Sequence, residues 1–126
     1  MAQTGFRLSV EEVAYAMGVL GEPDVAGGFM LTILGDLDEQ EREGHLYAAS
    51  HSLMARGLLD VDLETEAQHL DETLGGLIDV LLRHDFSIRC DRTIDGQEQL
   101  LTYFFHGDDI VENTLVKGVV SCLEPI

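Results

Sequence analysis

Apolar residues follow two different periods along the chain, and the period changes near Phe86. Before that position they recur at steps of three and four residues, the spacing of one face of a helix. From there onward Phe86, Ile88 and Cys90 alternate with polar residues, the spacing of a strand with one wet face. The pattern predicts an α+β fold in which about four N-terminal helices pack on a C-terminal antiparallel sheet of three to four strands.

Local signals predict where the first three helices begin. Ser9 and Glu12 have the spacing of a capping box, so a first helix should start there. Pro23 can open a second helix, because its missing amide hydrogen would have no partner in the first turn anyway. Gly27-Gly28 weakens this helix, and we attribute the pair to a close helix crossing. Asp38 is the N-cap expected for a third helix.

The segment Leu53-Met54-Ala55-Arg56-Gly57-Leu58-Leu59-Asp60 predicts the end of the third helix. Gly57 fits the left-handed position just past a helix end, with Leu53 and Leu58 as the apolar pair of a Schellman motif. Beyond it, leucines at helical spacing from Leu63 to Leu82 predict a fourth helical region. Gly75-Gly76 is a candidate break within that region.

Turn residues divide the C-terminal region into strands that meander antiparallel. Asp95-Gly96 supplies the positive dihedrals of a tight hairpin turn, and Gly107-Asp108-Asp109 supplies a second turn. A last strand is expected over Val119 to Leu123.

The middle strand of this sheet is apolar on both faces. Leu100 and Phe104 lie on one side. The other side carries Leu101, Tyr103 and Phe105. One face needs the helices as cover, and the second needs a returning segment of the chain or a second copy. We therefore expect a homodimer, with Leu101, Tyr103 and Phe105 as candidate protein-interface residues.

Length and composition indicate one domain. With 126 residues, 45% of them hydrophobic, the chain is long enough for one core and too short for two ordinary ones. We divide this domain, 1–126, into a helical region over 1–85 and a region of antiparallel hairpins over 86–126. Cys90 and Cys122 are isolated on strand-like stretches, so buried thiols are expected rather than a disulfide.

The formal net charge of -17 makes nucleic acid and anionic lipid poor partners. Its simplest role is to keep the protein soluble. No apolar run reaches the roughly 20 residues of a membrane span, and the N-terminus lacks the basic flank and apolar stretch of a secretory signal. We therefore expect a cytoplasmic protein with no membrane partner.

No reactive or metal-binding pattern stands out in the sequence. His45 and His51 do not share a helix face, and the other histidines are scattered among different elements. Asp60-Val61-Asp62-Leu63-Glu64 opens like a calcium loop, but Thr65 stands where that loop needs glycine. Neither a serine elbow nor a phosphate-binding loop is found. We expect a non-enzymatic protein, with no catalytic residue, metal or cofactor.

These expectations favour a protein-binding or adaptor module. One alternative is a sensor or regulator that binds a small apolar ligand between helices and sheet, with Tyr103 and His106 as its polar handles. A second alternative is an acidic decoy that captures a DNA-binding protein in place of nucleic acid.

One stretch of the chain resembles a known family. Ser52-Leu53-Met54-Ala55-Arg56-Gly57-Leu58-Leu59-Asp60, followed by a helical run into Phe86-Ser87-Ile88-Arg89-Cys90 and by hairpins, is similar to the N-terminal half of the ESX (type VII) secretion-associated chaperone-like family. The specific sequence similarity covers Leu46 to Leu59. This resemblance implies a cytosolic adaptor that binds helical secretion substrates. The family's chains are longer and carry a pseudo-repeated sheet, which a homodimer would replace here.

The same order of elements also resembles winged-helix proteins, in which a helix with a glycine-leucine turn precedes a hairpin. Here the corresponding helix, Glu39 to Arg56, is acidic at its start, which argues against DNA reading.

Overall fold

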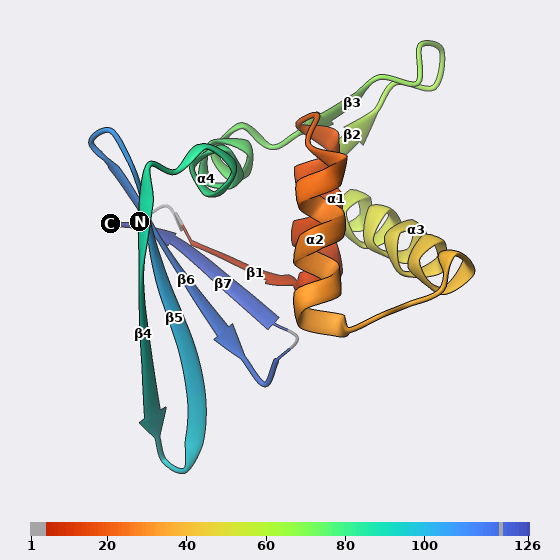
Figure 1. Ribbon diagram of the computed structural model, residues 1–126. Helices are drawn as coiled ribbons and strands as arrows, with labels where there is room; N and C mark the ends of the chain where they lie inside the picture. Colours follow the sequence, from red (N-terminus) through yellow and green to blue (C-terminus); the bar gives the residue numbers. More distant parts are fainter. Residues whose placement is uncertain (1–4, 119) are drawn as a thin grey trace.

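The computed structural model of the protein describes residues 5–118 and 120–126, which form four helices and seven strands (Figure 1). In chain order these elements are β1 (Phe6–Ser9), α1 (Val10–Val19), α2 (Pro23–Leu34), α3 (Glu39–Ala55), β2 (Leu59–Val61), β3 (Gln68–Leu70), α4 (Glu72–Arg83), β4 (Phe86–Ile94), β5 (Gln97–His106), β6 (Asp109–Val116) and β7 (Val120–Pro125). The predicted α+β class is confirmed.

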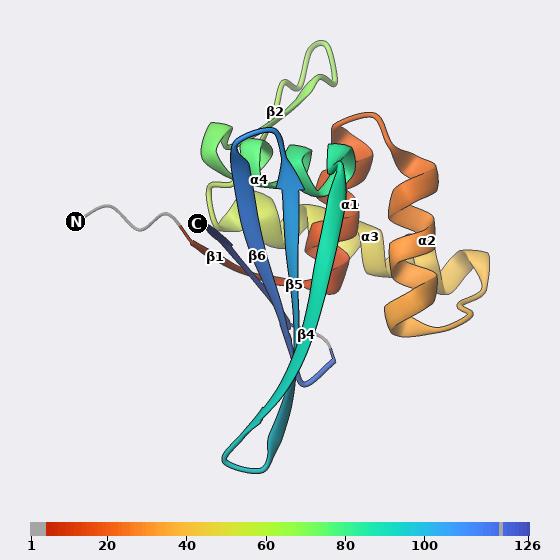
Figure 2. The ribbon, with the colours of Figure 1, turned by 60° about the vertical axis from the view of Figure 1, so that its left-hand side comes forward.

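Five strands form one antiparallel sheet in the order β1-β7-β6-β5-β4, and β2 and β3 form a separate hairpin. β4 and β5 are joined by the predicted two-residue turn, in which Asp95 and Gly96 have φ angles of 52° and 77°. Figures 1 and 2 show the four helices on one side of the five-stranded sheet. None of the described elements covers its other side.

The sheet has five strands where three or four were predicted, because the N-terminal segment adds β1. This strand pairs with β7, with Leu8 opposite Ser121, and Leu8 is 1% exposed. Four residues are too few to show an alternating pattern, so no strand was predicted there. Residues 1–85 are therefore not purely helical. The last strand runs Val120–Pro125, and Val119, where it was expected to begin, lies outside the described residues.

The fourth helix is shorter than predicted. Residues 59–70 form the β2–β3 hairpin, and α4 begins only after Asp71, whose side chain accepts a capping hydrogen bond of 3.0 Å from an amide of the first turn. Between the strands, Asp62 Oδ1 accepts a hydrogen bond from the amide of Glu64 at 2.9 Å and turns the chain. Gly75-Gly76 lies inside an uninterrupted α4, so the predicted break there is wrong.

The two predicted N-caps are confirmed. Ser9 Oγ accepts a hydrogen bond from the amide of Glu12 at 3.1 Å, and Glu12 Oε1 accepts one from the amide of Ser9 at 2.8 Å, which completes the capping box of α1. Asp38 Oδ1 accepts a hydrogen bond from the amide of Glu41 at 2.7 Å at the start of α3. These bonds satisfy amides that have no partner within the helix.

The predicted stop of α3 is also confirmed. Gly57 has a φ angle of 74°, and the amide of Leu58 donates to the carbonyl of Leu53 at 2.9 Å, as in a Schellman motif. The attribution of Gly27-Gly28 to a close helix crossing is wrong. A Cβ atom placed at either glycine meets no heavy atom within 4 Å, and Gly28 instead lines an open cleft.

The core lies between the helices and the covered face of the sheet. Its fully buried side chains come from elements far apart in sequence, among them Leu8, Val13, Leu53, Ile78 and Leu123. α1 contacts β1 and β7, and α4 contacts β5, β6 and β7. α2 and α3 pack mainly on α1, so that α2 stands away from the sheet (Figure 1).

Candidate functional site

The middle strand of the sheet turns different side chains to its two faces. Leu100 and Phe104 of β5 face the helices and line a cleft there. Because successive side chains point to opposite faces of a strand, the odd-numbered residues of β5 point away from the helices. The structure thus brings together, on the uncovered side, the three predicted interface residues Leu101, Tyr103 and Phe105.

The hairpin register adds side chains of β4 to this group. It pairs three residues of β4 with the three of β5, in the order Phe86–Phe105, Ile88–Tyr103 and Cys90–Leu101. We call these six side chains the outer face. The rings of Phe86 and Phe105 are stacked, with centroids 4.5 Å apart and planes inclined by 9°. The stack fixes the two rings against each other on the surface of the sheet.

Exposure differs strongly within the outer face. Phe86 is 55% exposed and Ile88 is 52% exposed, whereas Leu101 is only 3% exposed. Phe86 and Ile88 therefore offer more contact surface than Leu101, which was predicted as an interface residue. Neither Phe86 nor Ile88 was predicted to belong to the interface. A signal for them is present in the sequence, because the two-residue turn at Asp95-Gly96 fixes which residues of β4 and β5 lie side by side.

The cysteines differ from the prediction of buried thiols. Cys90 is exposed and Cys122 is half-buried, and both are free. The prediction is wrong for Cys90 because this residue lies on the edge strand β4, which is exposed at every position.

The two residues predicted as polar ligand handles lie apart. Tyr103 belongs to the outer face, where a hydrogen bond with Glu112 and, secondarily, desolvation raise its pKa above the usual value. His106 ends β5, and its Nδ1 lies 3.8 Å from Oδ1 of Asp85, between α4 and β4. Neither Tyr103 nor His106 lines the cleft between the helices and the sheet.

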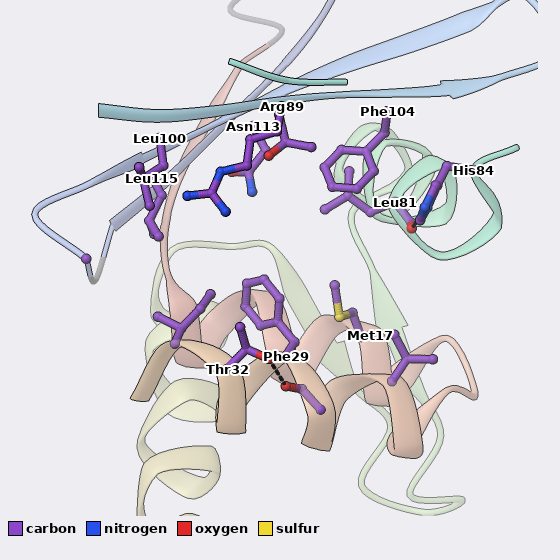
Figure 3. Close-up of a pocket in the computed structure, with 15 residues that line it drawn as sticks. Met17, Phe29, Thr32, Leu81, His84, Arg89, Leu100, Phe104, Asn113 and Leu115 are labelled. Carbon is purple, nitrogen blue, oxygen red and sulfur yellow. Dashed lines mark hydrogen bonds between the residues drawn. The ribbon is translucent and has the colours of Figure 1, made fainter. Parts of the chain in front are cut away.

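The cleft has a volume of about 680 Å³ and lies between α2 and the covered face of the sheet. In Figure 3, Phe29 and Met17 on the helix side face Leu100, Leu115 and Phe104 on the sheet side. The volume falls within the range of about 300–1,000 Å³ that is usual for small-molecule sites. The cleft stays open because α2 packs on α1 and not on the sheet.

Most polar side chains of the cleft already have partners within the chain. Thr32 and Asn113 are hydrogen-bonded to other groups of the protein, and His84 Nδ1 lies 2.8 Å from a carbonyl at the end of α4. Arg89 of β4 has its Nε 3.1 Å from Oδ1 of Asp91, and its side chain stays 64% exposed. The cleft is thus an apolar groove with an arginine on its sheet side.

β4 forms an open edge of the sheet. It is nine residues long and exposed at every position. In the portion of the chain that the structure describes, it pairs only with β5. Its hairpin with β5 projects beyond the helices (Figures 1 and 2). One row of backbone amides and carbonyls along β4 is therefore accessible to another strand.

Within residues 5–118 and 120–126, no group of three or more His, Cys, Asp and Glu side chains is placed to hold a metal ion. None of the helices described has both the length and the apolar character needed to cross a membrane. Comparison of the chain with models of known protein families gives no match, and comparison with curated proteins gives none either. The outer face, the β4 edge and the cleft are therefore the features that indicate what the protein binds.

Proposed function

We propose that this chain is a cytoplasmic, non-enzymatic protein-binding module of the adaptor or chaperone type, and that it meets its partner through the outer face. The observation that supports this function is the exposure of Phe86 and Ile88, 55% and 52%, beside the half-buried Tyr103 and Phe105. Large apolar side chains that are grouped on an exposed surface mark interaction sites in soluble proteins.

The outer face has the properties of an energetically useful contact. Fully burying a large apolar side chain contributes about 1.5–3 kcal/mol, and Phe86 and Ile88 still have about half of that contribution available. The stacking of Phe86 on Phe105 limits the side-chain entropy that binding removes. Tyr103 and Glu112 add a polar border to the apolar centre, the usual anatomy of a protein interface.

Two sequence features support an adaptor role. The sequence segment from Leu46 to Leu59 resembles the ESX secretion-associated chaperone-like family, whose members bind helical protein substrates. The net charge of -17 favours a partner that carries basic groups around an apolar contact, because complementary charge speeds and orients association.

The outer face is tested by placing a charge in its centre. Immobilised wild-type protein is expected to retain a specific partner from lysate of the source cells, and Phe105→Asp is expected to lower its recovery by about tenfold or more, since 1.4 kcal/mol changes affinity tenfold. Leu63→Asp is the matched control, because Leu63 is 92% exposed on the β2–β3 hairpin and lies off the outer face. Quantitative mass spectrometry measures the recovery.

Phe105 is half-buried, so circular dichroism must show that the variant is folded, and Ile88→Asp repeats the test at a more exposed position. Equal recovery of the partner by the Phe105, Ile88 and Leu63 variants would contradict the proposed function.

A second candidate function, a sensor of a small apolar ligand, is supported by the apolar cleft of about 680 Å³. Gly28→Leu should fill the cleft from α2, where a Cβ atom has free space. Gly44→Leu on exposed α3 is the control. A lipid or metabolite that raises the melting temperature of the wild type and of the Gly44 variant, but not of the Gly28 variant, supports this function. No shift across a broad panel counts against it.

A further inference from the structure

The β4 edge lacks most of the features that keep an exposed strand from pairing with another chain. It has nine residues, no proline and no break in its pairing with β5. The opposite edge, β1, has only four residues. A long, regular edge strand is a template for a further strand. The pattern of charges along β4 decides which strand fits it.

The turn geometry defines which backbone groups of β4 are available. Because Asp95 and Gly96 both have positive φ angles, Ile94 and Gln97 form the hydrogen-bonded pair next to the turn. Pairs alternate along an antiparallel ladder, so the even-numbered residues of β4 bond to β5. The odd-numbered residues direct their amides and carbonyls outward, namely Ser87, Arg89, Asp91 and Thr93.

We infer that β4 pairs antiparallel with β4 of a second copy of this chain, around a two-fold axis at Cys90. Cys90 is the middle residue of β4, so this register pairs all nine positions. It places Arg89 opposite the partner's Asp91 and Asp91 opposite the partner's Arg89. Both pairs join outward-directed residues, as a hydrogen-bonded ladder requires.

Neighbouring registers lose this complementarity. A shift of the axis by one residue places two copies of Arg89, or two copies of Asp91, directly opposite each other. A shift by two residues in either direction leaves only five positions of β4 paired. Toward the turn it also places two copies of Arg92 opposite each other, and the other way it places Arg89 opposite the partner's Ser87. Like charges directly opposite each other destabilise a strand pair, and opposite charges stabilise it.

This inference rests on the proposed function in one respect, because it takes the sheet as the binding surface and names its first partner. The paired edges would join two sheets of five strands into one. Cys90 would lie beside the partner's Cys90 and Phe86 beside the partner's Ile94, so the two outer faces would lie on the same side of the joined sheet, with Arg92 of each copy beside Ile88 of the other. A further protein partner would then meet a surface twice as large as that of one copy.

Cys90 gives a direct test of the register. Two residues opposite each other in a non-hydrogen-bonded pair have Cα atoms about 4.5 Å apart, within the range of about 4.4–6.8 Å found for disulfides. Copper-phenanthroline with oxygen should therefore join two Cys90 thiols, releasing two protons and passing two electrons to the oxidant. Cys122→Ser is expected to cross-link as the wild type does, whereas Cys90→Ser should give no covalent dimer on a non-reducing gel.

Light scattering of the reduced protein is expected to show a dimer. A monomer at all accessible concentrations, or cross-linking that depends on Cys122 and not on Cys90, would overturn the inference.

A charge-reversal experiment separates pairing between copies from the Arg89–Asp91 contact within one strand. Arg89→Asp gives a chain with two acids at the edge, and Asp91→Arg gives a chain with two arginines. Each variant alone should dimerise about tenfold more weakly, because two attractive cross-strand pairs become repulsive. An equimolar mixture should form a heterodimer at least as tightly as the wild type, measured by native mass spectrometry.

In the mixture each chain still lacks its own Arg89–Asp91 contact, so recovery cannot come from within one chain. Variants that dimerise as tightly alone as in the mixture would overturn the inference. Arg89 and Asp91 point to the helix side of the sheet and lie off the outer face. If the Arg89 and Asp91 variants dimerise like the wild type while Phe105→Asp still fails to recover the protein partner, the inferred β4 pairing is contradicted and the proposed function stands. If these variants weaken dimerisation while Phe105→Asp recovers the partner normally, only the proposed function is contradicted.

Discussion

Glu12 is 4% exposed, yet both of its carboxylate oxygens have partners. Arg56 Nη1 lies 3.0 Å from each oxygen, and Ser52 Oγ donates to Oε2 at 3.0 Å. Oε1 also accepts the amide of Ser9 within the capping box. Arg56 in turn donates to the carbonyl of Arg7 at 2.7 Å. One side chain therefore connects the start of α1, the end of α3 and β1.

Removal of Arg56 should destabilise the protein, because it leaves the buried carboxylate of Glu12 without its charged partner. Loss of one partner of a buried ion pair costs about 3–5 kcal/mol. The cost should be smaller here, because the Arg56 side chain is 38% exposed and Glu12 keeps its serine partners. We therefore expect Arg56→Met to lower the free energy of unfolding by about 2–3 kcal/mol. Adding Glu12→Gln should recover some of this loss. Urea unfolding measures both changes.

The exposed pair Arg83–Asp79 provides the matched control for this cycle. Its side chains are 70% and 44% exposed. Because exposed ion pairs contribute little, Arg83→Met should cost no more than about 0.5 kcal/mol. An effect of Arg83→Met equal to that of Arg56→Met would show that the buried network has no special role.

Tyr103 should ionise only above its ordinary pKa of 10.0, because its protonated hydroxyl is hydrogen-bonded to Glu112 and partly desolvated. This interaction contributes stability below the unfolded pKa, and the contribution is lost as the pH rises through the raised folded pKa. Glu112→Gln should lower the pKa toward the ordinary value, because it removes the neighbouring negative charge. Carbon-13 NMR of labelled tyrosine follows the titration, with Glu98→Gln as control. An unchanged midpoint in the Glu112 variant would contradict this account.

Replacing either of two glycines that have no close neighbours by alanine should change the stability of the protein, in opposite directions at the two positions. Gly57 has a φ angle of 74°, so Gly57→Ala should destabilise the protein by about 1 kcal/mol through backbone strain alone. Gly27 lies inside α2 with free space around its Cβ position, so Gly27→Ala should stabilise it by about 0.5–1 kcal/mol. Thermal unfolding compares them. A loss of stability in Gly27→Ala would indicate a contact that α2 makes only transiently.

The helices and strands that were predicted well from the sequence are those with local signals. The caps of α1 and α3 use partners three residues away, and the β4–β5 turn is two residues long. β1 was missed because its partner is distant, with Phe6 opposite Leu123, and because four residues carry too little pattern. β2 and β3 were missed because the helical spacing of leucines continued across Leu63, which is 92% exposed.

The candidate site was predictable only to the level of which side chains share a face. Alternation placed Leu101, Tyr103 and Phe105 together, as the structure shows. Their exposure depends on which strand forms the edge, and that is decided when β1 joins the sheet beside β7 and leaves β4 at the other end. The cleft depends on α2 resting on α1. The hydrophobic periodicity of the sequence predicts neither the position of β1 in the sheet nor the packing of α2 on α1.

The net charge of -17 bears on every association of this protein, including that of two copies. Two such chains repel each other over long distances, and salt screens this repulsion with a Debye length of about 10 Å at 0.1 M. In the proposed dimer, the Arg89–Asp91 pairs across the β4 edges join side chains that are 64% and 44% exposed, so salt screens their attraction too, but only two such pairs act against the repulsion between two chains that each carry a charge of -17. The apolar contact of Phe86 with the partner's Ile94 in that dimer is not weakened by added salt.

Dimerisation should therefore tighten as sodium chloride is raised from low to moderate concentration, as measured by sedimentation velocity. The heterodimer of the Arg89→Asp and Asp91→Arg variants should follow the same trend, because its total charge equals that of the wild-type dimer. An acidic decoy predicts the opposite for its partner, since capture of a basic protein weakens with salt. Dissociation of the wild-type dimer by moderate salt would show that charge attraction, and not strand pairing and apolar contact, holds the copies together.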